Sequence, residues 1–246
     1  MLFRSAGLPV VVSDWNGYRD TVRDGIDGFL VPTCMPTDDA AGCIESGYSL
    51  GAEPYERFVG GVAATVSVDE IAASKAFEAL AKDVSLRRSM GIAGQKRVAE
   101  HYDWPHVIRA FETLWDELGQ RRKWENERTR GNEIAPGQRT ISNPFALFSG
   151  HPSTTFSEEA ELYCREGIPL SKFVAETKLD LFAFVRESFS CEEELHKLWE
   201  SIKSRPGVKL AQLIDASDMR SRSRVMRTIG WLMKLGFVYL KPQTSR

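Results

Sequence analysis

The sequence predicts an α/β protein in two parts: a unit built on a parallel sheet, followed by a mostly α-helical domain. Three observations lead to this prediction. Residues 9–13 form an apolar run rich in β-branched side chains, which is typical of a strand buried on both faces of a parallel sheet. Residues 123–143 are charged, contain Gly and Pro and show no apolar period, as expected of a linker. Residues 144–246 then follow mostly helical spacing. The predicted boundaries are therefore 1–122, 123–143 and 144–246.

The first part begins with a strand–loop–helix–strand order. A loop over residues 14–17 follows the first strand, and its Asn and Gly tolerate positive φ. Residues 18–23 fit a short helix that stops near Gly25, and residues 28–32 fit a second strand. Ligands of doubly wound folds bind at the carboxyl ends of such strands, which is where this loop lies.

The next elements are an insertion and three helices. Residues 33–61 are polar and glycine-rich, longer than a usual α/β connection, with a short helix expected over 54–59. Ser67 and Glu70 have the spacing of a capping box for the helix that follows. Further helices are expected over 85–102 and 104–122, with Asp103 as the N-cap of the latter.

The order of residues in the first part resembles the C-terminal, donor-binding domain of GT-B glycosyltransferases of family 4, also called group 1. The match resumes over residues 67–118, so it covers about half of the chain. It rests on these spaced positions: Gly7, Pro9, Val10, Val11, Ser13, Asn16, Gly17, Asp20, Val22, Gly25, Gly28, Phe29, Leu30, Val31 and Pro32.

The resemblance implies an incomplete parallel sheet of Rossmann type, one half of a GT-B fold, and a nucleotide-sugar edge around the loop. The candidates for that edge are Gly7, Ser13, Asp14, Asn16, Gly17 and Asp20. A backbone N–H near a helix start can face a phosphate without a charged side chain. Turn chemistry explains the loop residues equally well, and Asp20 also suits a helix N-terminus. Trp15 either stacks on a ligand or plugs the sheet edge, and we favour the plug.

The resemblance also implies the reaction: transfer of a glycosyl unit from a nucleotide sugar to an acceptor, by a retaining mechanism without a metal. The nucleotide sugar is then a substrate, and no cofactor is expected. The family has two glutamates, and Leu2 stands where the second is expected. We therefore expect a donor-domain fragment without turnover of its own, and we assign no catalytic residue. A separate GT-B N-terminal half, or a protein of the acceptor pathway, is the expected partner.

Composition is ordinary for a globular protein: 246 residues, 42% hydrophobic and 27% charged, with a net charge of −2. No apolar run approaches the ~18 residues of a membrane span, and no signal peptide pattern is present, so we expect a cytoplasmic protein. The four cysteines (Cys34, Cys43, Cys164 and Cys191) have no CxxC spacing, so neither a zinc site nor a disulfide framework is predicted.

The second part ends in a basic tail that resembles a winged-helix module. Helices are expected over 157–166, 170–189, 191–204, 210–216 and 220–235, with Gly236 as the last C-cap. Residues 204–246 hold nine Lys or Arg against two Asp, a local charge of +7, so the remaining residues carry −9. In the last helix we expect Arg220, Arg224 and Arg227 to share an exposed face, with Arg222 pointing away.

This tail gives an alternative function of a different class, a non-enzymatic interaction or DNA-binding module. Three arginines suit weak contact with phosphates, whereas reading a sequence requires side chains set against base edges. We expect any binding to DNA to be weak, salt-sensitive and without sequence preference. A solvated helix face, or a docking face for an acidic protein or lipid headgroups, explains the same arginines.

Overall fold

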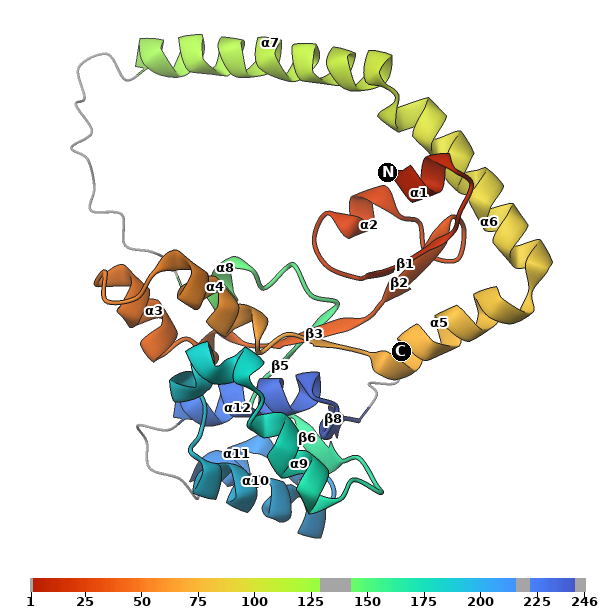
Figure 1. The fold of residues 1–246 in the computed structure, drawn as a ribbon. Coiled ribbons are helices and arrows are strands. Elements are labelled where there is room, and N and C mark those ends of the chain that lie inside the picture. Colours follow the sequence, from red (N-terminus) through yellow and green to blue (C-terminus); the bar gives the residue numbers. More distant parts are fainter. Residues whose placement is uncertain (1, 129–142, 216–221, 242–246) are drawn as a thin grey trace. The chain divides into compact units, whose positions relative to one another are not determined.

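The computed structural model describes residues 2–128, 143–215 and 222–241, and the protein is of the mixed α/β class (Figure 1). The chain divides into two compact units that interleave in sequence. The first unit comprises residues 1–12, 19–30 and 74–140, and the second comprises residues 13–18, 31–73 and 141–246. The domain boundaries predicted at residues 122 and 143 stay predictions, because a division by contacts in space does not test boundaries along the sequence.

The first unit contains two short neighbouring strands, four α-helices and most of a fifth within its described residues. Strands β1 (Val10–Ser13) and β2 (Gly28–Val31) form a two-stranded sheet, so both predicted strands are confirmed. The expectation that the first strand is buried on both faces is wrong, because all four residues of β1 are only half-buried. The helices are α1 (Leu2–Ser5), α2 (Tyr18–Thr21), α6 (Val84–Arg97) and α7 (Trp104–Arg128), and α5 (Glu70–Lys82) belongs to this unit from residue 74 onward. A turn of π-helix, Val98–Tyr102, joins α6 to α7.

Glycines allow close backbone approach in the first unit. A Cβ on Gly91 of α6 would lie 2.0 Å from the carbonyl oxygen of Gly7, and a Cβ on Gly28 of β2 would lie 2.5 Å from that of Val10. Such separations exclude any side chain, so these two glycines set how closely the elements pack. Gly7 itself has a φ of +76°, which favours glycine in the turn between α1 and β1.

A buried ion pair also holds the first unit together. Arg4 of α1 is 4% exposed and lies 3.4 Å from the carboxylate of Asp27, which is fully buried. Asp27 also accepts hydrogen bonds from the backbone N–H and the Nε of Arg23. Removal of Asp27 would leave the buried guanidinium of Arg4 without its counter-charge, which typically costs about 3–5 kcal/mol.

The second unit contains two three-stranded sheets. The first has the order β4–β3–β5, formed by β4 (Ser67–Val68), β3 (Thr33–Pro36) and β5 (Thr154–Phe156). Strand β3 runs antiparallel to β4 and parallel to β5, with Cys34 opposite both Ser67 and Thr154. The second sheet has the order β7–β6–β8, formed by β7 (Val208–Lys209), β6 (Glu161–Cys164) and β8 (Val238–Leu240), all antiparallel.

Helices surround these sheets, and the hydrophobic core of the second unit packs around the last of these helices, α12. The helices are α3 (Cys43–Ser49), α4 (Tyr55–Ala63), α8 (Pro144–Leu147), α9 (Leu170–Thr177), a 3₁₀ segment (Asp180–Ser188), α10 (Glu192–Ser204), α11 (Leu210–Asp215) and α12 (Arg222–Lys234). Every residue of α12 from Val225 to Leu232 is buried. Trp231 stacks on Phe189, and Trp199 of α10 stacks on Phe173, so aromatic pairs fill this core.

Two sequence predictions are wrong here for tertiary reasons. Ser67 does not cap a helix, because it lies in strand β4 and its hydroxyl donates to the carbonyl of Cys34. The N-cap role falls to Asp69, whose carboxylate accepts from the N–H of Ala72 at 2.9 Å. The helix predicted over 157–166 is instead strand β6, because that segment pairs with β7 and β8.

Other predictions are confirmed or extended. The last helix begins after Asp103 as predicted, but α7 continues to Arg128, into the segment interpreted as a linker. The rest of that segment, residues 129–142, lies outside the described residues. Gly236 ends α12 with a φ of +73°, as predicted for its C-cap.

Candidate functional site

Four of the predicted site residues lie at the end of β1 and in the loop after it, and hydrogen bonds within the chain fix most of the loop's backbone. The N–H of Asp14 donates to the carbonyl of Val31 at 2.7 Å, and that of Asn16 donates to the carbonyl of His151 at 3.0 Å. The N–H groups of Trp15 and Tyr18 also bond within the loop. The backbone therefore offers few N–H groups to a ligand. Because α2 has only four residues, its dipole adds little attraction for a phosphate.

The side chain of Asp14 holds this loop to a segment far away in sequence. Its carboxylate accepts a hydrogen bond from the hydroxyl of Ser153 at 2.6 Å. The carbonyl oxygen of Asp14 accepts from the hydroxyl of Thr33 at 2.8 Å, and that hydroxyl accepts from the N–H of Ser153. Asp14, Thr33 and Ser153 thus form one small network of charge-assisted and neutral bonds. The role of Asp14 in this network is structural.

Trp15 packs inward, as the plug interpretation predicted. Its ring meets the ring of His151 edge to face at 5.6 Å, and it packs against the hydrophobic core of the second unit. The side chain therefore fills the base of the loop. His151 and Ser153 were not predicted, because they lie more than 130 residues beyond the loop and no local pattern marks them.

Asn16 and Gly17 form the exposed tip of the loop. Asn16 has a φ of +42° and is the one described non-glycine residue with positive φ. Asparagine tolerates this conformation better than most residues, yet the conformation still costs free energy. A Cβ built on Gly17 meets nothing within 4 Å, so the space at the tip is open. Of the loop's predicted ligand contacts, these two positions are the accessible ones. Ser13 ends β1 and its carbonyl accepts from the N–H of Trp15.

The other two predicted residues, Gly7 and Asp20, belong to the first unit. Gly7 lies in the tight turn against α6 described above. The carbonyl oxygen of Asp20 accepts from Arg97 at 2.8 Å and from the hydroxyl of Tyr102 at 3.1 Å, and its side chain is exposed. Both residues therefore have structural roles in that unit, and the six candidates divide between the two compact units.

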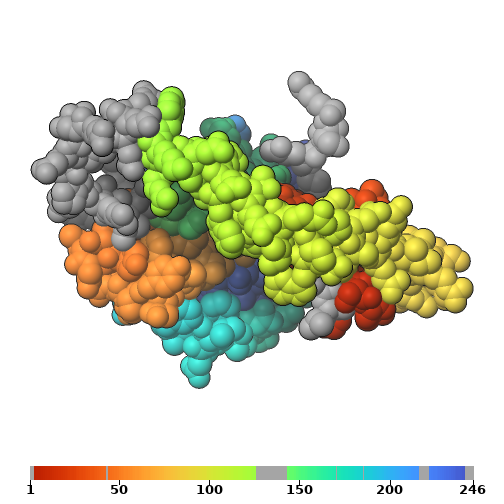
Figure 2. Space-filling view, turned by 90° about the horizontal axis from the view of Figure 1, so that it is seen from above, coloured from red at the N-terminus to blue at the C-terminus, as the bar shows by residue number. Residues whose placement is uncertain are grey.

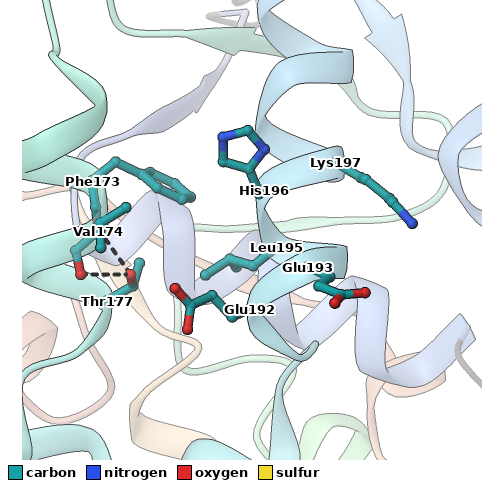
Figure 3. A pocket seen from close by; sticks show the side chains of 8 residues that line it. All are labelled: Phe173, Val174, Thr177, Glu192, Glu193, Leu195, His196 and Lys197. Carbon is teal, nitrogen blue, oxygen red and sulfur yellow. Dashed lines mark hydrogen bonds between the residues drawn. The ribbon is translucent and has the colours of Figure 1, made fainter.

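A hollow of about 570 Å³ lies between α9 and α10 in the second unit (Figure 3). Its apolar lining comes from Phe173, Val174 and Leu195. Thr177 contributes a hydroxyl that donates to the carbonyls of Phe173 and Val174 at 2.9 and 3.2 Å, so this polar group is already used by the helix.

The charged residues of the hollow line its α10 side, where Figure 3 places Glu192, Glu193, His196 and Lys197. Glu192 pairs with Lys178 at 2.7 Å, on an exposed surface where such a pair contributes little free energy.

The basic residues of α12 are not arranged as predicted. Arg227 is 1% exposed, and its guanidinium donates to the carbonyls of Ala40, Ala41 and Ser188 at 2.6, 3.1 and 2.9 Å. Arg227 is therefore a structural residue of the core and cannot contact phosphates. Arg222, expected to point away alone, is half exposed and pairs with Glu158 and Asp39. Arg220 lies outside the described residues.

Two thiols of the second unit are poor nucleophiles. Burial raises the pKa of the Cys34 thiol, and burial also raises the pKa of Cys164 to about 11. Since the thiolate is the reactive form, neither residue is activated for catalysis. Within residues 2–128, 143–215 and 222–241, no three His, Cys, Asp or Glu side chains gather as metal ligands would. No helix in the same ranges is both long and apolar enough to cross a membrane.

Comparison with known proteins finds no relative of this chain. No family model matches the chain, and neither a curated protein nor a solved structure matches it.

Proposed function

We propose that the loop after β1 is part of a nucleotide-sugar site of the GT-B glycosyltransferase type, in the family-4 or group 1 class. The observation that supports this most directly is the tip of the loop, where Asn16 adopts a left-handed conformation beside an open Gly17. A strained residue next to open space at the end of a strand suggests a ligand-binding role. The strand–loop–helix–strand order of β1, α2 and β2 supports the same proposal, because ligands of doubly wound folds bind at this position.

In this proposal the residues of the loop have two roles, positioning the loop and contacting the ligand. Asp14 and Trp15 hold the loop through Ser153 and His151, so they are positioning residues. Asn16 and Gly17 would contact the ligand. The side-chain amide of Asn16 would form hydrogen bonds, and Gly17 would let the ligand approach the backbone closely. The proposed contribution of this loop is donor binding. Transfer of the glycosyl unit to an acceptor is the activity implied for the parent enzyme, by a retaining route without a metal.

For the C-terminal residues we propose a winged-helix-like arrangement that serves protein contacts rather than DNA reading. The succession α10, α11, α12 with the small sheet β7–β6–β8 supports the architecture. The burial of α12 from Val225 to Leu232 argues against its use as a free recognition helix.

Binding of UDP- and GDP-sugars to the full chain tests the donor site. We expect saturation-transfer NMR to detect one of these ligands with the unmodified chain. Gly17→Trp should abolish the signal, because the indole fills the open space at the tip without displacing any neighbour. Gln120→Trp, an exposed position on α7, is the matched control and should leave binding unchanged.

Two results would overturn the proposal. One is the absence of binding to every UDP- and GDP-sugar tested. The other is binding that Gly17→Trp and Gln120→Trp affect equally, because the ligand would then sit elsewhere on the chain.

A further inference from the structure

Helix α7 exposes an unusually long apolar stripe. Trp104, Ile108, Phe111, Trp115 and Leu118 follow the 4-3-4-3 spacing of a coiled-coil seam. At about 100° per residue they occupy a sector roughly 80° wide on one side of the helix. Their exposed fractions are 74%, 47%, 48%, 63% and 49%. In Figure 2, α7 is lime green and lies at the surface.

Over residues 109–121 the opposite side of the helix is polar. Arg109, Thr113, Asp116, Glu117 and Gln120 all lie there, and Glu117 pairs with Arg121 along the helix. A helix with one apolar and one polar side is amphipathic and requires a partner for the apolar side. Within the described residues of the first unit, nothing covers this stripe.

The size of the stripe suits an interface. The exposed parts of Trp104, Phe111 and Trp115 amount to roughly 400 Å², given that aromatic side chains bury 150–250 Å² each. With the neighbouring aliphatic residues Ile108, Leu114 and Leu118 the apolar area reaches roughly 600 Å², which is at the top of the range for patches on monomers. Two such stripes facing each other would bury roughly 1,200 Å², the lower end of stable protein interfaces.

The sequence of the stripe is complementary to itself when the second helix runs antiparallel. With a twofold axis level with Thr113, Ile108 faces Leu118 of the second copy, and Phe111 faces Trp115. Each contact occurs twice, as a twofold interface requires.

In the same register Arg122, the one cation in line with the stripe, also faces a partner. Arg122 falls at the angular position of Trp104, five helical turns along, and in the antiparallel pair it faces Trp104 of the second copy. A guanidinium against an indole face is a favourable cation–π contact. Glu112 lies near Glu112 of the second copy only at the edge of the helix pair, where water and salt screen the two charges.

We propose that α7 is a homodimerisation helix and that the stripe is covered by the α7 helix of a second copy of this chain in an antiparallel pair. The proposal is independent of the function proposed for the loop after β1. It rests on the exposed area, the spacing and the self-complementary register described above.

Sedimentation velocity of the full chain across the micromolar range tests the dimer. We expect the mass of two chains for the unmodified protein and the mass of one for Trp115→Glu, whose charge would be buried in the seam. The matched control is Trp124→Glu, the same change on the same helix, at a 60% exposed position on the opposite side. Trp124→Glu should remain a dimer, and circular dichroism should show that both variants keep their helix content.

A cysteine pair tests the antiparallel register. Glu112→Cys lies beside the twofold axis and should form a disulfide-linked dimer on mild oxidation. Gln120→Cys lies on the polar side and should not, and both variants share the native cysteines, so the difference reports the added thiol.

The proposal is overturned by an unmodified chain that stays monomeric across the range. A monomer destabilised by Trp115→Glu would show that another part of the same chain covers the stripe. Equal loss of the dimer in both tryptophan variants would refute the seam, and a dimer without the Glu112→Cys crosslink would refute the antiparallel register.

Discussion

Replacing Arg227 with alanine should destabilise the second unit far more than any loss of surface charge. The guanidinium is 1% exposed and donates hydrogen bonds to the carbonyls of Ala40, Ala41 and Ser188. These bonds tie α12 to the segment after β3 and to the segment before α10. In Arg227→Ala, the carbonyls of Ala40, Ala41 and Ser188 lose the guanidinium as a donor, although that of Ala41 keeps the N–H of Ile44, and a cavity replaces the side chain.

The magnitude follows from the number and kind of these bonds. A hydrogen bond to a charged group contributes about 1.5–3 kcal/mol. The contributions do not add in full, because the buried guanidinium also carries a desolvation cost that the alanine variant no longer has, so we take a total of about 3–5 kcal/mol. We therefore expect Arg227→Ala to lower the free energy of unfolding by about 4 kcal/mol. Arg227→Lys keeps the charge but not the planar fork, and we expect about half that loss, roughly 2 kcal/mol.

Urea unfolding followed by tryptophan fluorescence measures this change. Trp199 and Trp231 are each 2% exposed in the second unit, so their emission reports its unfolding. Arg222→Ala is the control, since Arg222 is 49% exposed in its ion pairs and should contribute less than about 1 kcal/mol. If Arg227→Ala destabilised the chain no more than Arg222→Ala, the structural role assigned to Arg227 would be refuted. A folded Arg227→Lys variant with weakened DNA binding would also contradict it.

Two further predictions concern packing and thiol chemistry. Gly91→Ala should lower the thermal stability of the first unit by about 2 kcal/mol or more, because the new Cβ would lie 2.0 Å from the carbonyl of Gly7. Gly119→Ala, a helical glycine whose Cβ meets nothing within 4 Å, should instead raise stability by about 0.5–1 kcal/mol, and an equal effect of the two in circular dichroism melts would count against the close approach. Burial raises the pKa of Cys164 from 9.0 to about 11, so its thiolate forms only as the pH rises toward that value. Iodoacetamide below pH 9 should therefore modify the exposed Cys191 first, and peptide mass spectrometry showing Cys164 modified first would contradict this.

Part of this fold could be predicted because it depends on local chemistry. The β-branched run of β1, the run of β2 and the glycine that ends α12 act through conformational preferences of the residues themselves. The start of α7 after Asp103 is local in the same sense. Its apolar spacing was also readable from the sequence, although the exposure of that stripe was not.

The candidate site was predictable only in position. The sequence placed a loop with Asn16 and Gly17 after the first strand, and the structure has that loop. That Asp14 would be held by Ser153, and Trp15 by His151, could not be predicted, because these contacts join residues more than 130 positions apart.

Tertiary structure alone decided the remaining features, since each depends on hydrogen-bond partners that lie far away in the sequence. Strand β6 replaced a predicted helix because two distant strands offered its backbone hydrogen bonds. Ser67 joined a strand rather than a helix cap for the same reason. Arg227 lies in a helix whose pattern of charges suggested an exposed face, yet three carbonyls from other segments compensate the cost of burying its guanidinium. Local sequence thus determined the positions of β1, β2 and the start of α7, whereas long-range hydrogen bonds determined the strands β4 and β6 and which polar groups remain accessible to a ligand.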